Sequence, residues 1–175
     1  SNSYIQLKDY IESIRAKGNN KAVVLAAYMD YGENLGTSYE AENATKVGVA
    51  VNTNWPGYTG TGFVDGFAEV NDSVTFNINA PETGDYSLVF RIANGASMAN
   101  RNLYIDGVLN KTVLIEPTGG WGTWSHKTWA KVTLTAGNHA IKFAYDAANA
   151  GGINLDSLTL GTFNADSVIL ADAMM

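Results

Sequence analysis

Residues 38–161 consist of short runs rich in β-branched and aromatic residues, and turn signals separate these runs. No other feature constrains the fold as strongly. The expected strands are residues 47–51, 73–78, 86–92, 101–105, 111–115, 128–134, 139–145 and 153–160. Turn-forming sequences lie between them at Pro81-Glu82-Thr83-Gly84-Asp85, Asp106-Gly107 and Ala136-Gly137-Asn138. Many short strands at this spacing predict an all-β fold, a β-sandwich of the jelly-roll type.

The two ends of the chain have different patterns. Residues 4–17 carry apolar side chains at helical spacing, and Gly18-Asn19-Asn20 supplies a helix stop. Residues 21–29 form a continuous apolar run, typical of a strand buried on both faces of a parallel sheet. From Asn164 the chain favours a second helix, which ends on apolar residues at Met175 and indicates that a longer chain was cut there.

Helix and buried strand before the β-rich segment, and an apolar helical end after it, predict an insertion. We expect residues 1–37 to be a helix and strand of a host catalytic barrel. Residues 38–161 would be the inserted module, and residues 162–175 the segment that returns to the barrel. The alternative is a helical decoration packed on the sandwich. With either arrangement the sandwich is one domain within the 175 residues.

Composition excludes several classes of function. Hydrophobic residues make up 46% of the chain and charged residues 16%, which is typical of a folded domain. The net charge of −6 argues against nucleic acid, whose phosphates require a basic face. The chain has no cysteine, and no apolar run approaches the roughly 20 residues of a membrane span. Ser1-Asn2-Ser3 is not the start of a signal peptide, so an export signal would lie elsewhere in a secreted protein.

Two features of the sequence could bind a ligand. Glu40 and Glu42 are two residues apart on an expected strand, so their carboxylates should share one face. They could simply face solvent, act as a glycosidase acid and base, or hold calcium together with Asp156 if the first and last strands are neighbours. Spacing alone does not separate these alternatives.

Aromatic residues in glycine-rich loops are the second feature. A sugar ring presents one apolar face and a rim of hydroxyls, so it is bound by an aromatic platform with planar amides around it. Trp121 lies in a loop too rich in glycine to be a packed strand, whereas Trp129 fits the following strand. Core packing remains the alternative for each large aromatic side chain. Further loop candidates for hydrogen bonds to sugar are Asn94, Asn100, Arg101 and Asn149.

Four blocks, in order, resemble carbohydrate-binding modules of family 35 and the related family 6. They are Tyr39-Glu40-Ala41-Glu42-Asn43, Gly57-Tyr58-Thr59-Gly60-Thr61-Gly62-Phe63-Val64, Gly119-Gly120-Trp121-Gly122-Thr123-Trp124 and Asn154-Leu155-Asp156-Ser157-Leu158. The resemblance implies a structural calcium ion bound by Glu40, Glu42 and Asp156, with a carbonyl of the 59–62 loop, assigned to Thr61, as a further ligand.

The same resemblance implies the sugar site. It makes Trp121 the stacking platform and Asn154 a hydrogen-bonding contact, while Trp124 packs into the sandwich. Tyr58 and Phe63 are candidates for a second aromatic wall, and Trp55 is a further candidate for contact with ligand. Related modules often have tyrosine where this chain has Phe63, which changes the hydrogen bonding expected there.

The flanks carry a second resemblance. Residues 21–29 and 170–175 are similar to barrel segments of glycoside hydrolase family 66, which includes dextranases and cycloisomaltooligosaccharide glucanotransferases. This implies a secreted bacterial enzyme with a noncatalytic module that binds α-1,6-glucan, such as dextran or isomaltooligosaccharides, and tethers it to the barrel. The alternatives are a module that only braces the barrel, or one that binds another polysaccharide such as xylan or pectin.

Overall fold

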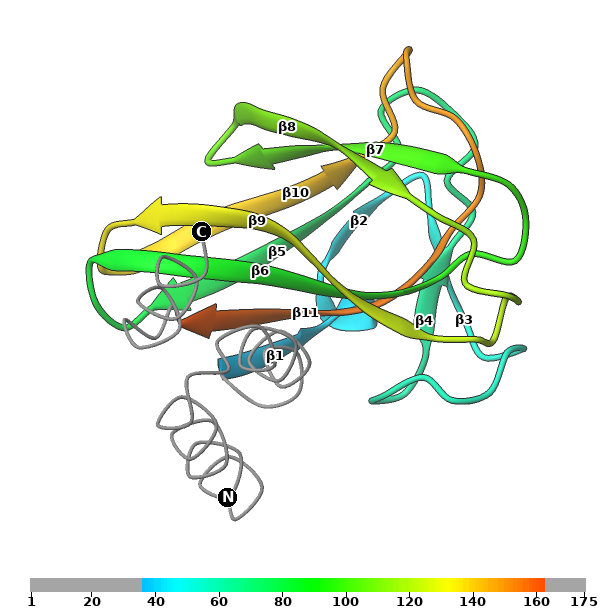
Figure 1. Ribbon diagram of the computed structural model, residues 1–175, viewed down its shortest axis with the longest axis horizontal. Helices are drawn as coiled ribbons and strands as arrows, with labels where there is room; N and C mark the ends of the chain where they lie inside the picture. The colour runs from blue at the N-terminus through cyan, green and yellow to red at the C-terminus, as the bar shows by residue number, and fades with distance from the viewer. Residues whose placement is uncertain (1–35, 163–175) are drawn as a thin grey trace, which may run out of the picture. The chain divides into compact units, whose positions relative to one another are not determined.

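The computed structural model describes residues 36–162, and these form an antiparallel β-sandwich (Figure 1). The expected all-β fold is therefore confirmed. The helices and the buried strand expected in the flanks lie outside the described residues. The proposed division of the chain at residues 37 and 162 stays a prediction.

One sheet has six strands in the order β3-β4-β11-β6-β9, with β1 also paired to β11. Its strands are β1 (Gly36–Glu40), β3 (Ala50–Asn52), β4 (Phe63–Asp65), β6 (Gly84–Ala93), β9 (Ser125–Leu134) and β11 (Asn154–Thr162). The first and last strands are thus neighbours, in antiparallel register with Glu40 opposite Ser157. This pairing was the condition for Asp156 to lie near Glu40.

The second sheet has five strands in the order β2-β5-β10-β7-β8. They are β2 (Thr45–Val47), β5 (Ser73–Ala80), β7 (Ala99–Ile105), β8 (Val108–Ile115) and β10 (Gly137–Ala144). The β7–β8 turn is the predicted Asp106-Gly107, and both residues have positive φ, 51° and 81°. Two consecutive positive φ values are the requirement of the tight hairpin turn that Asp-Gly favours.

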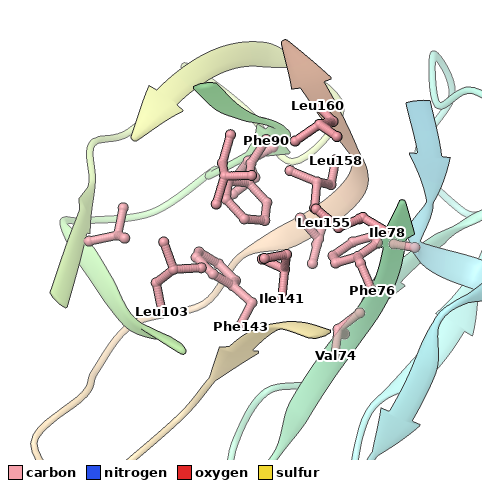
Figure 2. Packing of buried hydrophobic residues seen from close by; sticks show 14 of the residues in the cluster. Val74, Phe76, Ile78, Phe90, Leu103, Ile141, Phe143, Leu155, Leu158 and Leu160 are labelled. Carbon is pink, nitrogen blue, oxygen red and sulfur yellow. The ribbon is translucent and has the colours of Figure 1, made fainter. Parts of the chain in front are cut away.

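The core lies between the two sheets, where alternate side chains of both inner faces meet (Figure 2). Phe90 of β6 is fully buried and stacks on Phe143 of β10, with ring centroids 4.8 Å apart. The ring of Phe76 on β5 also contacts Phe90, with ring centroids 6.2 Å apart. Large aromatic side chains from both sheets therefore hold the layers together, which leaves the loops at the strand ends free to carry function.

One strand prediction is wrong. This range, residues 47–51, is divided between two strands of different sheets, because β2 ends at Val47 and β3 begins at Ala50. Gly48 lies between them with φ 70°, and a Cβ there would come within 1.8 Å of the Asp72 carboxylate. The glycine thus allows a sharp change of direction at a position where a side chain has no room. Apolar residues alternate on both sides of it, so the sequence pattern alone does not reveal the break.

Candidate ligand-binding and cation sites

Strand β11, an interior strand of the six-stranded sheet, connects two regions that could bind a ligand. Asn154 Nδ2 donates a hydrogen bond of 2.8 Å to the carbonyl of Trp121. Two residues further along, Asp156 accepts hydrogen bonds from Thr59 and forms an ion pair with Arg91 at 2.6 Å. Residues two apart on a strand point to the same side, so this short stretch reaches both the acidic residues and the β8–β9 loop, residues 116–124, which we call the tryptophan loop.

Trp121 lies on the backbone of two other loops. A Cβ at Gly95 would come within 2.6 Å of the indole Cγ, and a Cβ at Gly152 within 3.0 Å of Cη2. The indole is half-buried, with its five-membered ring close to Gly95 and its six-membered ring close to Gly152. The structure thus brings Asn154 and Trp121 together, although Asn154 is only 4% exposed and its amide supports the tryptophan loop directly.

Asn94 fastens the loop that contains Gly95. Its side-chain amide donates to the carbonyls of Ser97 (2.9 Å) and Ile115 (3.0 Å), and its Oδ1 accepts from the Ala96 N–H (3.0 Å). The sequence suggested that Asn94 could hydrogen-bond to sugar. Asn94 is fully buried, so it holds the loop and does not contact sugar. The same correction applies to Arg101, which lies within β7 and is fully buried.

A second aromatic group lies where the 55–60 loop meets the tryptophan loop. Phe63 is fully buried, with its ring 5.9 Å from that of Tyr58 and 5.3 Å from that of Trp124. The prediction that Phe63 forms a wall against ligand is therefore wrong, because the neighbouring rings cover it. Trp124 is half-buried against Phe63 and donates its indole N–H to Pro56 O at 3.0 Å. Trp55 is 40% exposed and remains available to ligand.

Glu40 and Glu42 do not share a strand. Glu40 is the last residue of β1, and Glu42 lies in a short 3-10 helix, η1 (Ala41–Asn43), closed by a hydrogen bond from Ala44 N–H to Ala41 O. Both carboxylates nevertheless converge on Gly60, which has φ 63°. A Cβ at Gly60 would lie 2.2 Å from Glu42 Oε1 and 3.1 Å from Glu40 Cδ. The turn at Gly60 therefore provides the space in which the two acids meet.

The Glu42 carboxylate is only partly satisfied. Its Oε1 accepts from the Thr61 N–H at 2.7 Å and from the Thr61 hydroxyl at 3.3 Å. Its Oε2 is buried and has no hydrogen-bond partner. An unpartnered carboxylate oxygen below the surface is costly. Thr61 thus contacts Glu42 through its N–H and its hydroxyl. The sequence predicted a different role, in which the Thr61 carbonyl binds calcium.

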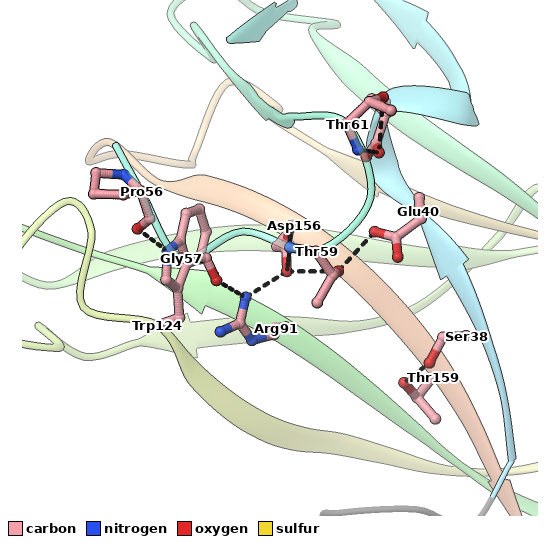
Figure 3. Close-up of polar contacts among 11 residues, drawn as sticks. Ser38, Glu40, Pro56, Gly57, Thr59, Thr61, Arg91, Trp124, Asp156 and Thr159 are labelled. Atoms are coloured by element: carbon pink, nitrogen blue, oxygen red, sulfur yellow. Dashed lines mark hydrogen bonds and ion pairs between the residues drawn. The ribbon is translucent and has the colours of Figure 1, made fainter. Parts of the chain in front are cut away.

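Thr59 and Arg91 surround Asp156 (Figure 3). The Thr59 hydroxyl donates to Glu40 Oε2 at 2.8 Å and to Asp156 Oδ2 at 3.0 Å as alternative partners. Arg91 Nη1 donates to Asp156 Oδ2 and to Gly57 O at 2.8 Å. Burial raises the pKa of Asp156 against these stabilising contacts. Burial also raises the pKa of Glu40, and the neighbouring charges of Glu42 and Asp156 raise it further.

Arg91 was not identified from the sequence, and Thr59 was expected only as part of the 59–62 loop and not as a donor to Asp156. Arg91 lies on β6, which is next to β11 only because of the sheet order, and nothing in its local sequence indicates that position. Within residues 36–162, no three carboxylate or imidazole groups are arranged as a ready-made metal centre. A cation in the space at Gly60 would nevertheless give the unpartnered Glu42 oxygen a partner. It would also reduce the repulsion between the neighbouring carboxylates.

Comparison with known proteins identifies the class of this sandwich. The family model "Carbohydrate binding module (family 35)" matches residues 37–163. The chain therefore belongs to carbohydrate-binding module family 35. This membership confirms the prediction of a sugar-binding module without a catalytic role of its own.

Individual relatives extend the similarity into the flanks. The chain is 62% identical over its whole length to a cycloisomaltooligosaccharide glucanotransferase of Niallia circulans, and it spans 18% of that protein. It matches the structure of a Paenibacillus sp. cycloisomaltooligosaccharide glucanotransferase complexed with cycloisomaltoheptaose with a TM-score of 0.75 and 51% identity, covering 98% of this chain and 25% of that one. These similarities confirm the resemblance to glucanotransferases of glycoside hydrolase family 66.

An isolated module gives the same fold. The structure of a family 35 module from Paenibacillus barcinonensis matches with a TM-score of 0.67 and 31% identity, covering 73% of this chain and all of that one. The sandwich thus corresponds to a complete module. No helix within the described residues is long and apolar enough to cross a membrane.

Proposed function

We propose that this module binds α-1,6-linked glucans, such as dextran and isomaltooligosaccharides, and tethers them to a glucanotransferase or dextranase domain of the same chain. The observation that carries this proposal is the half-buried Trp121 on its two glycines, in a chain 62% identical to a cycloisomaltooligosaccharide glucanotransferase. A structure similar over 98% of this chain is complexed with cycloisomaltoheptaose, which supports the choice of linkage.

Trp121 supplies the apolar contact. An indole offers a large rigid face, and stacking on the C–H face of a glucose ring gains contact area at little cost in conformational freedom. Gly95 and Gly152 keep the indole in place by close approach of their backbones. Asn154 holds the Trp121 carbonyl and so fixes the position from which the indole projects. Trp55 adds a second, more exposed aromatic surface.

Tethering is the consequence for the longer protein. One or two aromatic platforms give weak binding to a single chain segment. A linked catalytic domain nevertheless benefits, because bound glucan is presented at a high effective concentration. Dextran is an extracellular substrate, so we also propose that the protein is secreted.

We further propose that a calcium ion binds at Glu40, Glu42 and Asp156, with oxygens of the 59–61 loop. The unpartnered Oε2 of Glu42 and the convergence of two carboxylates on Gly60 support this proposal. Calcium prefers carboxylate and carbonyl oxygens. Its charge would offset the burial and the repulsion between carboxylates that together raise the pKa of Glu40. The ion would tie β1 and the 59–61 loop to β11 and would take no part in sugar chemistry.

Calorimetric titration tests the proposed ligand. The chain is titrated with isomaltoheptaose, and with xylohexaose, pectin fragments and maltoheptaose as controls for linkage. We expect heat of binding with isomaltoheptaose alone, and a loss of affinity of about five- to thirtyfold in Trp121→Ala, since one stacked aromatic contributes about 1–2 kcal/mol. Stronger binding of xylohexaose or of pectin fragments would contradict the proposal that α-1,6-glucan is the ligand.

Absence of binding to every sugar would favour a structural brace for the catalytic domain. Phe63 provides a matched control for the Trp121 variant. Phe63→Leu alters a covered aromatic that meets Tyr58 and Trp124, so it should lower stability and leave the affinity for isomaltoheptaose close to that of the wild type.

A further inference from the structure

Arg101 is the largest fully buried side chain in the described part of the protein. It lies on β7, in the sheet opposite the one that carries Asn154 and Asp156. Its guanidinium carbon lies 4.8 Å from the ring centre of Phe67 and 4.9 Å from that of Tyr145. A cation in this position is enclosed by aromatic rings and has lost its contact with water.

The hydrogen bonds that Arg101 donates go to main-chain carbonyls. Nη1 donates to Asn100 O at 2.6 Å and to Ala150 O at 3.3 Å, and Nη2 donates to Gly151 O at 2.8 Å. The planar fork of one guanidinium thus holds two successive carbonyls of the β10–β11 loop. Its Nε is buried without a partner.

Burial lowers the pKa of Arg101 to about 10, which shows that the charged form is disfavoured at this position. An apolar side chain of similar volume would fill the space without that desolvation. What such a side chain cannot do is fix the direction of two carbonyls. An arginine at this position is therefore better explained by the loop carbonyls that it holds than by filling of the core.

The loop that Arg101 holds is the one beneath Trp121. Gly151 has φ 82° and is pressed against β7, where a Cβ would meet the Cβ of Ala99 at 2.6 Å. Asn100 Oδ1 accepts from the Ala150 N–H at 2.8 Å and so fixes the same segment from the other side. The next residue, Gly152, is the one whose backbone approaches the Trp121 indole.

We infer that Arg101 is a positioning residue for sugar binding, which clamps the 150–151 carbonyls so that Gly152 supports the indole of Trp121 in its binding orientation. This inference rests on the proposed function of Trp121. It gives a buried residue of the opposite sheet a role in affinity, although the side chain is covered and does not touch ligand.

The test combines an affinity with a signal from Trp121 that needs no sugar. In ¹⁵N-labelled protein each tryptophan gives one indole N–H resonance, and Trp121→Phe identifies that of Trp121 by its loss. In Arg101→Lys we expect this resonance to shift while those of Trp55 and Trp124 stay in place. The Kd for isomaltoheptaose should rise about tenfold, because the platform is no longer pre-organised.

Ile78→Val is the matched control, since Ile78 is fully buried on β5 and pairs with His139, five residues before the end of β10 at Ala144, where the loop begins. It should leave both readouts at wild-type values. A folded Arg101→Lys with an unmoved Trp121 resonance and wild-type Kd would overturn the inference. If Arg101→Lys does not fold, Arg101→Gln, which keeps two N–H donors, replaces it. Failure of both to fold would also overturn the inference, because Arg101 would then serve the fold alone.

One further outcome separates this inference from the proposed function. A shifted Trp121 resonance with an unchanged Kd would retain the positioning role of Arg101. It would count against Trp121 as the sugar platform.

Discussion

The Trp121 region and the acidic region are contacted by Asn154 and Asp156, two residues apart on β11, and are held in different ways. Around Trp121, the backbones of Gly95 and Gly152 and the amide of Asn154 set the position of one large side chain. Around Asp156, charges and hydroxyls of four segments meet, and one carboxylate oxygen remains without a partner. The first arrangement presents a surface and the second joins chain segments.

This difference predicts which property each region controls. An aromatic platform supported by backbone can be removed with little effect on the fold, because few contacts depend on it. A buried carboxylate that pairs with an arginine cannot be removed without leaving a charge uncompensated. Variants near Trp121 should therefore change affinity, and variants near Asp156 should change stability.

Asp156→Ala should have the largest effect on stability. The Asp156 side chain is fully buried and Arg91 is only 18% exposed, so the variant leaves a largely covered guanidinium without its partner. We expect the free energy of unfolding to fall by about 3–5 kcal/mol, measured by urea denaturation. A decrease below about 1 kcal/mol would show that the ion pair contributes little, and the distinction between the regions would weaken.

Removal of calcium should have the next largest effect. If the ion is present at about 100 times its Kd, chelation lowers the free energy of unfolding by about 2.7 kcal/mol. Thermal unfolding with calcium and with excess EDTA measures this difference. Glu42→Gln should abolish the response to EDTA, since it removes the charge of the carboxylate with the unpartnered oxygen. Identical melting curves with and without EDTA would contradict the calcium proposal.

Trp55→Ala should produce a small change in affinity and none in stability. Trp55 is 40% exposed, and its side chain packs on Gly122, the residue after Trp121. We expect a loss of about threefold in affinity for isomaltoheptaose, well below that of Trp121→Ala, in the same calorimetric titration. A loss equal to that of Trp121→Ala would make Trp55 an equal partner in the platform.

The smallest effect should come from the His139–Asp106 pair, away from both regions. His139 Nδ1 lies 2.6 Å from Asp106 Oδ2, and Nε2 lies 2.8 Å from Thr135 O. A neutral imidazole has one N–H, so only the charged form donates to both acceptors. The hydrogen bond to Asp106 and that to the Thr135 carbonyl raise the pKa of His139 above 6.5, while the same pairing lowers the pKa of Asp106.

Because the folded-state pKa of His139 is raised, its contribution is fully present below about pH 6.5 and is lost as pH rises through the folded value. We expect less than about 1 kcal/mol, as for other exposed pairs. Urea denaturation between pH 5 and 8 on the wild type and on His139→Gln measures it. Parallel pH profiles for the two proteins would contradict this assignment.

The sequence predicted most of the strands and the blocks at both regions, because β-branched runs, turn residues and the spacing of the two glutamates are local signals. It did not reveal the break at Gly48, which depends on the approach of Asp72. It also missed Arg91, whose partner lies on a strand 65 residues later. Phe63 was misassigned because burial of an aromatic residue is decided by tertiary neighbours that a local pattern does not contain.

The prediction that Glu40 and Glu42 share one face of a strand was wrong, although their carboxylates do meet. Both carboxylates lie together, but a short 3-10 helix brings them there and not a shared strand face. A spacing of two is compatible with either backbone path. The neighbours on β11 and the turn at Gly60 therefore decide where the carboxylates meet.

Chemical-shift mapping with isomaltoheptaose on ¹⁵N-labelled protein tests the separation of the two regions most directly. The largest shifts should fall on residues 94–97, 118–122 and 151–154, with the Trp121 indole N–H among them. Glu40, Glu42 and Thr61 should change little. Shifts concentrated at these acidic residues, or on the outer face of the five-stranded sheet, would contradict the assignment of sugar binding to the Trp121 region.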